Sequence, residues 1–470
     1  MRLPLAALAT AAPVALMLSP VCGLTLNAER PVPPDFIVTA APAYEPLAEL
    51  RGQERFPKGA QLLLVHAGKA EPLVTAFAAS ADANVSFDGQ TVLFAGKQSA
   101  GDPWQIWELT FKDRSMRKAM DTATDAERPF YLPGGRMVWA QRTPAGFQLQ
   151  SSEDGHPTPK FLNPTAGPGM LPLTYVQASA FPADVLRDGR ILFEAGFPLG
   201  KGSTPEMYLV YADGSGVESV RCDHGRARWG GTQLASGDVV FTHGTSLARF
   251  TSAMAHEDPV QAPRGTYVGA IAETASGAWL VSARASTEAR YAIKMCTPGA
   301  TEMHSILARN EEDLVEPVLV APRPRPNRHP SGLHPWDYAN LLALDARVSR
   351  DGDLRARPVS VRLKAQDASG RTVAMGTAPV EQDGSFFVKV PADRPIRFTL
   401  LDFKGSVVRQ EHGWFWARGG EQRICVGCHA GPERASENRV PAVLMRTTEP
   451  VDLTGAKSMA APQTGAPGGN

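Results

Sequence analysis

Short apolar runs, each preceded by a turn that contains glycine, recur along the first two thirds of the chain. Five copies occupy residues 88–94, 134–139, 188–193, 236–241 and 276–281, and their turn glycines are 46, 54, 48 and 40 residues apart. A four-stranded β-propeller blade takes ~40–50 residues, and its tight hairpin turns need the positive φ that glycine supplies. The pattern therefore predicts a mainly β chain that begins with a β-propeller.

The propeller is expected over residues 55–320, with six blades although only five copies are visible. The sixth blade would join the apolar run 62–65 to the run 318–320, because pairing both ends of the domain in one sheet removes exposed strand edges. The repeats resemble those of TolB-like propellers. The alternative is a β-sandwich, whose strands recur every ~8–12 residues without a longer period.

A connector and a second domain follow the propeller. Residues 321–344 start with a stretch that carries five prolines in fifteen residues, which predicts an extended connector. Short alternating runs at 359–363, 385–390 and 396–401 predict a small β-sandwich over 345–410. The remaining segments are a short haem-binding c-type segment at 411–453, argued below, and a Gly/Ala/Pro tail at 454–470 that is expected to be disordered.

The first 28 residues have the pattern of a secretory signal peptide. Arg2 precedes an apolar stretch, and small residues follow near the expected cleavage site. A membrane anchor is the alternative, but three prolines interrupt the stretch, which is shorter than the ~20 residues of a spanning helix. A lipid-modified Cys22 is a further alternative. We expect an exported, periplasmic protein with no transmembrane segment in the mature chain.

Charge and cysteine content narrow the function. The 470 residues carry 48 basic and 48 acidic side chains, whereas nucleic-acid binding depends on a basic surplus, so no nucleic-acid partner is expected. Five cysteines are too few for a disulfide scaffold. Cys222 and Cys296 lie in neighbouring repeats and could form one disulfide or remain two thiols.

The pentapeptide at 425–429 carries the chemistry. It contains Cys425, Cys428 and His429 in the CxxCH spacing that attaches one covalent haem c. In such sites the two thiols form thioethers with the haem, and the histidine binds the iron from the proximal side. A zinc site would need two more ligands, and no second CxxC or HxxxH supplies them.

The 41 residues after His429 are too few to build a complete cytochrome, so preceding residues are expected to cover the haem. Trp414 and Trp416 are the expected apolar wall. His412 is the first candidate for the sixth iron ligand and Met445 the second. Either histidine of the connector, His329 or His334, could also reach the iron. Arginines at 418, 423, 434 and 439 could meet the haem propionates or be plain surface charge.

The segment 379–393, continuing through Trp414 to Cys425-Val-Gly-Cys-His429, resembles the haem-bearing middle domain of the hydrazine synthase alpha subunit family. Relatives in that family place a propeller before this domain, as this chain does. In hydrazine synthase the catalytic haem is associated with a tyrosine shortly after the motif, but this chain has no tyrosine beyond Tyr338, and the equivalent position is near Glu433. Hydrazine synthesis is therefore not expected.

These features favour an exported monohaem c-type cytochrome that transfers electrons, with the propeller as a docking platform for a redox partner protein. One alternative is a haem enzyme that acts on a small nitrogen or oxygen species. Another is a binding protein whose propeller recognises a ligand and whose haem is structural or sensory.

Overall fold

The computed structural model describes residues 33–455, apart from 153–169, 201, 203, 222–224, 252–255, 350–351, 353 and 428–437. The predicted signal peptide, Cys22, Cys222, Cys428 and His429 lie outside the described residues, as does all of the predicted tail beyond 455. The chain divides into the units Met1–Val32 and Pro33–Asn470, and all described residues belong to the second unit. Across the residues that the structure describes, no helix has the length and apolarity needed to cross a bilayer.

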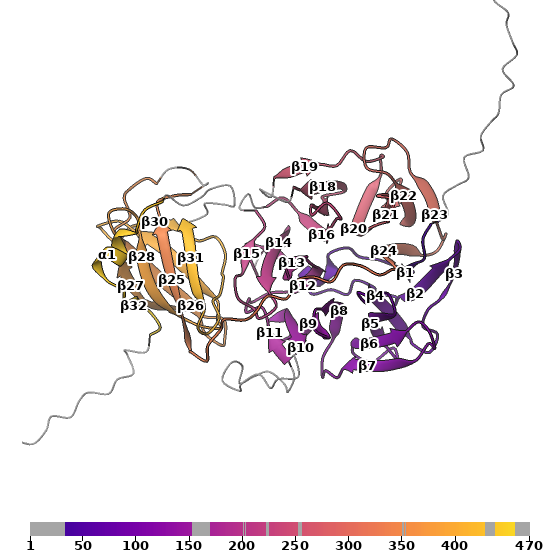
Figure 1. Cartoon of the computed structure of the whole chain (residues 1–470), viewed down its shortest axis with the longest axis horizontal. Helices are drawn as coiled ribbons and strands as arrows, with labels where there is room; N and C mark the ends of the chain where they lie inside the picture. The colour runs from indigo at the N-terminus through magenta and orange to yellow at the C-terminus, as the bar shows by residue number, and fades with distance from the viewer. Residues whose placement is uncertain are drawn as a thin grey trace, which may run out of the picture. The chain divides into compact units, whose positions relative to one another are not determined.

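The described part of the chain forms eight four-stranded sheets, of which six are the blades of a β-propeller. The predicted mainly β fold with a six-bladed propeller is confirmed. Figure 1 shows the inner strands of the six blades around a common centre. From the inside outward, the first three blades are β24 (Asp313–Leu319), β1 (Phe36–Ala41), β2 (Gln61–His66) and β3 (Lys69–Pro72); β4 (Ala79–Val85), β5 (Thr91–Lys97), β6 (Gln105–Thr110) and β7 (Met116–Met120); and β8 (Ala126–Leu132), β9 (Arg136–Thr143), β10 (Gly146–Ser152) and β11 (Met170–Pro172). The other three are β12 (Ala180–Val185), β13 (Arg190–Phe197), β14 (Thr204–Tyr211) and β15 (Glu218–Ser219); β16 (Arg228–Gln233), β17 (Val239–His243), β18 (Ser246–Phe250) and β19 (Glu257–Pro259); and β20 (Thr266–Glu273), β21 (Trp279–Arg284), β22 (Ala292–Cys296) and β23 (His304–Leu307).

The five glycine turns of the sequence pattern join the inner strand of a blade to its second strand. All five turn glycines have positive φ, between 73° and 96°, as the hairpin turns require. The sixth blade has no such turn, because its inner strand β24 and its second strand β1 come from opposite ends of the domain. The closure in one sheet was predicted correctly. However, β24 pairs with β1 rather than with residues 62–65, so the propeller starts at Phe36 and not at residue 55.

β-bulges interrupt the inner strands, and the residues within them adopt left-handed backbone conformations. Asp82, Arg128, Gly230, Gly269 and Glu316 occupy these positions, with φ between 50° and 70°. A bulge redirects a side chain that regular pleating would point elsewhere. Here all five residues line the central cavity.

The second domain is a sandwich of two sheets, with strand orders β31-β25-β28-β32 and β27-β26-β29-β30. Its elements are β25 (Tyr338–Asp345), β26 (Ser360–Gln366), β27 (Thr372–Pro379), β28 (Phe386–Pro391), β29 (Ile396–Leu401), β30 (Val407–Gln410), β31 (Gln422–Gly427), helix α1 (Ala442–Arg446) and β32 (Val451–Asp452). The three predicted strand runs correspond to β26, β28 and β29. The domain is larger than predicted, because β25 begins inside the expected connector and β31, α1 and β32 come from the expected haem-binding segment.

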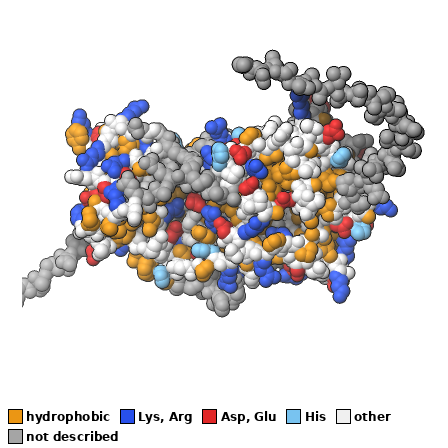
Figure 2. Space-filling model, turned by 45° about the horizontal axis from the view of Figure 1, so that its top comes forward, with side chains coloured by type: hydrophobic (Ala, Val, Ile, Leu, Met, Phe, Trp, Pro, Cys, Tyr) orange, Lys and Arg blue, Asp and Glu red, His pale blue; other side chains and the backbone are white. Residues whose placement is uncertain are grey.

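Charges of both signs are interspersed over the face shown in Figure 2, with apolar side chains between them. This distribution agrees with the balanced count of basic and acidic residues.

The propeller segment between β1 and β2 contains the short 3-10 helix η1 (Ala48–Arg51), whose Glu49 is buried.

Candidate functional site

The CxxCH motif begins on the edge strand β31 and continues past the end of that strand. β31 pairs in parallel with β25, so that Cys425 lies opposite Ala343 and Gly427 lies opposite Asp345. Cys425 is a free thiol, whereas Cys428 and His429 lie outside the described residues. The sheet therefore fixes the backbone position of the first cysteine, two residues before the strand ends.

The Cys425 side chain is half-buried against the core of the sandwich. Burial raises the pKa of its thiol, the guanidinium of Arg423 opposes this rise, and the charge of Glu411 adds to it. Both charged groups therefore lie near the thiol. Reactive cysteines have lowered pKa values, so Cys425 is instead a neutral thiol at pH 7.

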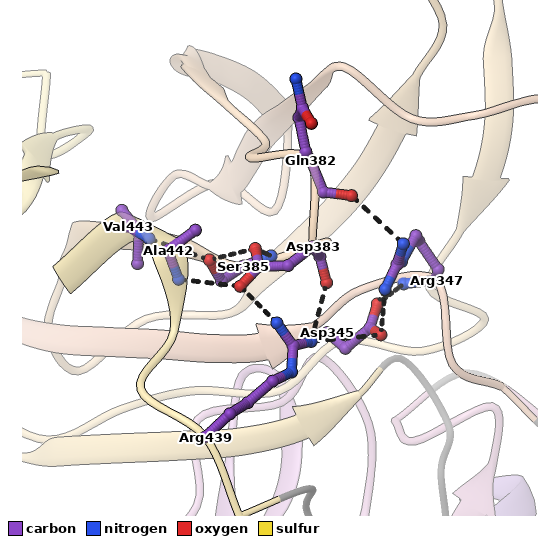
Figure 3. A network of polar contacts seen from close by, with 8 residues as sticks. All are labelled: Asp345, Arg347, Gln382, Asp383, Ser385, Arg439, Ala442 and Val443. Carbon is purple, nitrogen blue, oxygen red and sulfur yellow. Dashed lines mark hydrogen bonds and ion pairs between the residues drawn. The ribbon is translucent and has the colours of Figure 1, made fainter. Parts of the chain in front are cut away.

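Asp345 and Asp383, which we call the carboxylate clasp, hold the two flanks of the gap 428–437 (Figure 3). Arg439, just after the gap, has guanidinium nitrogens 2.7 Å from Oδ2 of Asp383 and 3.9 Å from Oδ2 of Asp345. Asp345 lies opposite Gly427, the last described residue before the gap. The described residues on the two sides of 428–437 are therefore held at the same place on the sandwich.

Asp383 also fixes the start of α1 (Figure 3). Its Oδ2 accepts a hydrogen bond from the backbone N–H of Ala442 at 2.8 Å. The hydroxyl of Ser385 donates to Oδ1 of Asp383 at 2.6 Å and accepts from the N–H of Val443 at 3.1 Å. Burial raises the pKa of Asp383, but the hydrogen bonds from Ser385 and Ala442 and the charge of Arg439 outweigh it and hold the pKa at about 2. Asp383 is therefore ionised throughout the physiological range.

A second set of contacts ties the residues before Cys425 to the propeller. Trp416 is fully buried in a core cluster of the propeller, and its Nε1–H donates to the carbonyl of Gly214 at 2.9 Å. Arg418 is also fully buried; it donates to Oδ1 of Asp393 at 2.6 Å and to the carbonyl of Pro172 at 3.1 Å. The lead-in to β31 is therefore part of the interior that the sandwich and the propeller share.

Glu421 and Arg423 extend these contacts along β31. Glu421 accepts hydrogen bonds from the N–H of Gly216 at 3.1 Å and from the N–H of Arg418 at 2.8 Å. Arg423 donates to the carbonyl of Val217 at 2.5 Å. Two arginines that were candidates for the haem propionates thus have protein partners here, as Arg439 has in the clasp, and residue 434 lies outside the described residues.

The predicted aromatic wall lies inside the protein. Trp414 is 3% exposed, with the guanidinium of Arg397 4.5 Å from its ring centroid, and Trp416 packs into the propeller. Both side chains therefore support the strand that carries Cys425. Direct contact between either tryptophan and a haem stays a prediction.

His412, the first candidate for the sixth ligand, is exposed on the turn that precedes Trp414. Its neighbour Glu411 is close enough to Cys425 to act on the thiol pKa. Its other neighbour, Gly413, lies so close to the propeller that an added Cβ would be 3.1 Å from the backbone nitrogen of Leu199. The turn thus lies near Cys425 and against the propeller.

The other candidate ligands belong to helix α1 and to the connector. Met445 is 74% exposed on α1. His329 stacks on Tyr211 of the propeller, with ring centroids 3.8 Å apart. His334 stacks on Trp336, which stacks on Tyr338 at the start of β25. Cys425 pairs with Ala343, which lies five residues beyond Tyr338 in β25. At ~3.3 Å per residue, the two positions on this strand are about 16 Å apart. The described contacts therefore hold His329 at the propeller and His334 near the start of β25.

Both flanks of the gap expose large apolar side chains. Ile424 is 65% exposed and Val440 is 63% exposed. A haem presents wide apolar faces that need such cover. Together with the free thiol of Cys425, these exposed apolar residues fit a covalently attached haem. The clasp is not evident in the sequence, because Asp345, Asp383 and Arg439 are far apart along the chain.

Cys296 is buried in β22, and burial raises the pKa of its thiol to about 11. Its expected partner Cys222 lies outside the described residues, so the disulfide stays a prediction.

Comparison with known proteins supports the predicted family relationship. Residues 345–430 match the family described as the hydrazine synthase alpha subunit middle domain. Hydrazine synthase from Kuenenia stuttgartiensis is structurally similar, with a TM-score of 0.72 and 16% sequence identity, over 88% of this chain and 71% of that chain. TolB from Acinetobacter baumannii aligns with a TM-score of 0.44 and 10% identity, over 60% of this chain and 66% of that one. No curated protein matches the sequence.

Proposed function

We propose that this chain, whose residues 345–430 form a middle domain of the hydrazine synthase alpha type, is an exported c-type haem protein that transfers electrons to or from a partner protein. One observation carries the proposal: the strand with Cys425 has a lead-in that is buried against the propeller, and Arg439, beyond the motif, is held by the carboxylate clasp. A motif whose flanks are fixed on both sides suits a cofactor that must keep one orientation.

The residues of the motif have distinct roles in this proposal. Cys425 and Cys428 hold the group through two thioether bonds, and His429 binds the iron. The haem supplies an iron that alternates between the ferric and ferrous states. Ile424 and Val440, on the two sides of residues 428–437, cover the apolar faces of the haem.

His412 is the proposed sixth ligand. Its turn lies near Cys425, since the charge of the neighbouring Glu411 acts on that thiol, whereas the ring of His334 is stacked on Trp336. A second imidazole would occupy the remaining iron position and exclude water and small ligands from it. Two imidazole ligands also give a lower reduction potential than a histidine–methionine pair does.

The propeller is the proposed docking platform. It is joined to the residues before Cys425 through buried contacts of Trp416 and Arg418, so a protein bound to the adjacent blades would lie near the haem. The N-terminal pattern with Arg2 and an apolar stretch supports export, and c-type haem is attached outside the bacterial cytoplasm.

Potentiometric titration of the protein, produced with its own N-terminus and with haem maturation factors, tests the proposal. We expect one haem per chain, a single reversible one-electron transition, and no change in the ferrous spectrum on addition of carbon monoxide. His412→Ala should raise the potential and allow carbon monoxide to bind, while His256→Ala, on an exposed propeller residue, should change neither. A haem that does not cycle would contradict the electron-transfer function.

A haem enzyme that acts on a small nitrogen or oxygen species is the second candidate. The observation that favours it is the aromatic stacking of His329 on Tyr211 and of His334 on Trp336, which gives both histidines of the connector partners other than a haem iron. If the wild-type ferrous protein binds carbon monoxide and nitric oxide, the sixth position is open and the enzyme is the better account.

A further inference from the structure

The centre of the propeller contains a cavity of about 500 Å³ that the haem proposal does not use. It is enclosed by the inner strands of the blades, with residues from β4, β8, β12, β16, β20 and β24 in its lining. Apolar side chains form much of the wall, among them Val85, Phe130, Val185, Leu234, Ile271 and Val318. A pocket of this size and lining is suited to a small organic molecule.

The connector covers the cavity at the ends of the inner strands. Pro322, Pro324 and Pro326 line it, and the guanidinium of Arg323 donates to Oδ1 of Asn84 at 3.3 Å. The N–H of Asn327 donates to the carbonyl of Arg187 at 2.8 Å. The connector is therefore held to the propeller by hydrogen bonds and forms one wall of the cavity.

The opposite side is formed by the segment between β1 and β2. Tyr44 and Phe56 from this segment pack with Ala79 at the start of β4 and with Trp229 near the start of β16. Arg55, which lies beside Phe56, also lines the cavity. The cavity thus has a charged floor at the starts of the inner strands and a proline-lined cover at their ends.

Two arginines and four carboxylates form the floor. Arg55 pairs with Glu49 at 2.8 Å, with Glu316 at 2.6 Å and with Asp82. Arg128 pairs with Glu49 at 3.1 Å and with Glu194 at 3.2 Å. The side chains of Glu49, Asp82 and Glu194 are 3–4% exposed, and that of Glu316 is 20% exposed.

Four carboxylates share two guanidiniums, so the ionised network has a net charge of two negatives although each carboxylate contacts an arginine. Burying such charge is costly, so the protonated form of the carboxyl groups is favoured. Burial raises the pKa of Glu316. Burial and the charge of Glu49 raise the pKa of nearby Glu127 to about 8. A cation placed in the cavity would offset the same charge. Glu316, Asp82 and Glu194 all line the cavity and would face it.

The nature of the cation follows from the shape and lining. Among the described residues no group of three or more His, Cys, Asp and Glu side chains has metal-site geometry. The volume is also far larger than a bare ion fills, and most of the wall is apolar. We propose that the central cavity of the propeller binds a small organic amine, with its ammonium group at Glu316 and Asp82 and its apolar part along the inner strands. This site is independent of the haem.

Binding of three matched probes tests the proposal: 4-phenylbutylamine, 4-phenylbutan-1-ol and 4-phenylbutyrate, titrated into the full-length mature protein by calorimetry at pH 7. They share one apolar part and differ in charge. We expect the amine to bind at least tenfold more tightly than the alcohol, since a charge-assisted hydrogen bond contributes more than a neutral one, and the carboxylate to bind most weakly.

Two variants locate the site, and both are checked for native circular dichroism. Glu316→Gln should weaken amine binding about tenfold and leave alcohol binding unchanged, while Glu288→Gln, at an exposed turn, should affect neither. Ala270→Leu fills part of the cavity without touching the charges and should weaken both amine and alcohol. The proposal is overturned if the wild type binds no probe, if amine and alcohol bind equally, or if Ala270→Leu leaves amine binding unchanged.

Discussion

Arg418 provides the most demanding test of how the motif strand is held to the propeller. Its side chain is fully buried, it forms an ion pair with Asp393 at 2.6 Å, and it donates to the carbonyl of Pro172. We consider Arg418→Met, which keeps the apolar volume and removes the charge and the donors. The variant leaves the carboxylate of Asp393 and the carbonyl without these partners.

The magnitude follows from those two losses. Breaking a buried pair by removing one partner costs about 3–5 kcal/mol, and Asp393 is 27% exposed, which places its share near the lower end. A carbonyl left without its donor adds about 1 kcal/mol. Arg418→Met should therefore lower the free energy of unfolding by about 4 kcal/mol.

The loss should depend on pH. Burial raises the pKa of Asp393, and the charge of Arg418 limits the rise, so the substitution raises this pKa further. An acid whose pKa is higher in the folded state favours folding at low pH, and this contribution is lost as pH rises through the folded-state pKa. The deficit of Arg418→Met should thus be larger at pH 7 than at pH 4.

Urea unfolding followed by tryptophan fluorescence measures the effect, because Trp416 is buried at the same place. Arg371→Met, which removes an exposed arginine paired with Asp367, is the control and should leave the midpoint unchanged. Adding Asp393→Asn to Arg418→Met should restore part of the stability. An unchanged midpoint for Arg418→Met, or no recovery in the double variant, would refute this account of the contact.

Three further predictions follow from the same structure. Gly189→Ala should destabilise the protein by more than 1 kcal/mol, because φ is +88° and the new Cβ would lie 2.4 Å from the carbonyl oxygen of Asn327, whereas Gly277→Ala, at φ +79° with no atom within 4 Å, should cost only about 1 kcal/mol in thermal unfolding. Asp383→Asn should lower stability by about 1–2 kcal/mol at pH 7; because the native pKa is about 2, the difference should shrink from pH 4 towards pH 2 in acid unfolding, and a constant difference would contradict the clasp. In protein made without haem maturation, alkylation of Cys425 should become fast only above its ordinary thiol pKa, because burial raises that pKa; rapid alkylation at pH 7 would show that the thiol is exposed.

Most of the blade count could be predicted from the sequence because the same turn must be built in five of the six blades. Gly89 and its four equivalents need positive φ, and apolar residues must follow to form the second strand. The true start at Phe36 could not be predicted this way. The blade of β24 and β1 is closed by strands from the two ends of the domain, so it has no turn and leaves no repeat in the sequence.

The candidate site was only partly predictable for a similar reason. The CxxCH spacing is local, so Cys425 could be identified from the sequence alone. Its surroundings depend on contacts between distant residues, such as Trp416 with Gly214 and Arg439 with Asp383. The strand β25 was also missed, because the prolines before Tyr338 extended the expected connector into it.

The cavity floor was missed because its residues are scattered along the chain. Three of them, Asp82, Arg128 and Glu316, lie at bulges that no local pattern predicts, and Arg55 lies in the segment between β1 and β2. These residues come together only when the blades close. Charged residues within strands are individually ordinary, and only their burial around one cavity distinguishes them.

Intact-mass measurement of the mature, exported protein under denaturing conditions tests the central claim most directly. The account predicts a mass increased by one haem, lost in the Cys425→Ser/Cys428→Ser variant and retained in Cys296→Ser. A wild-type mass equal to that of the polypeptide alone, after export together with functional haem maturation factors and with Cys425 and Cys428 open to alkylation, would contradict it.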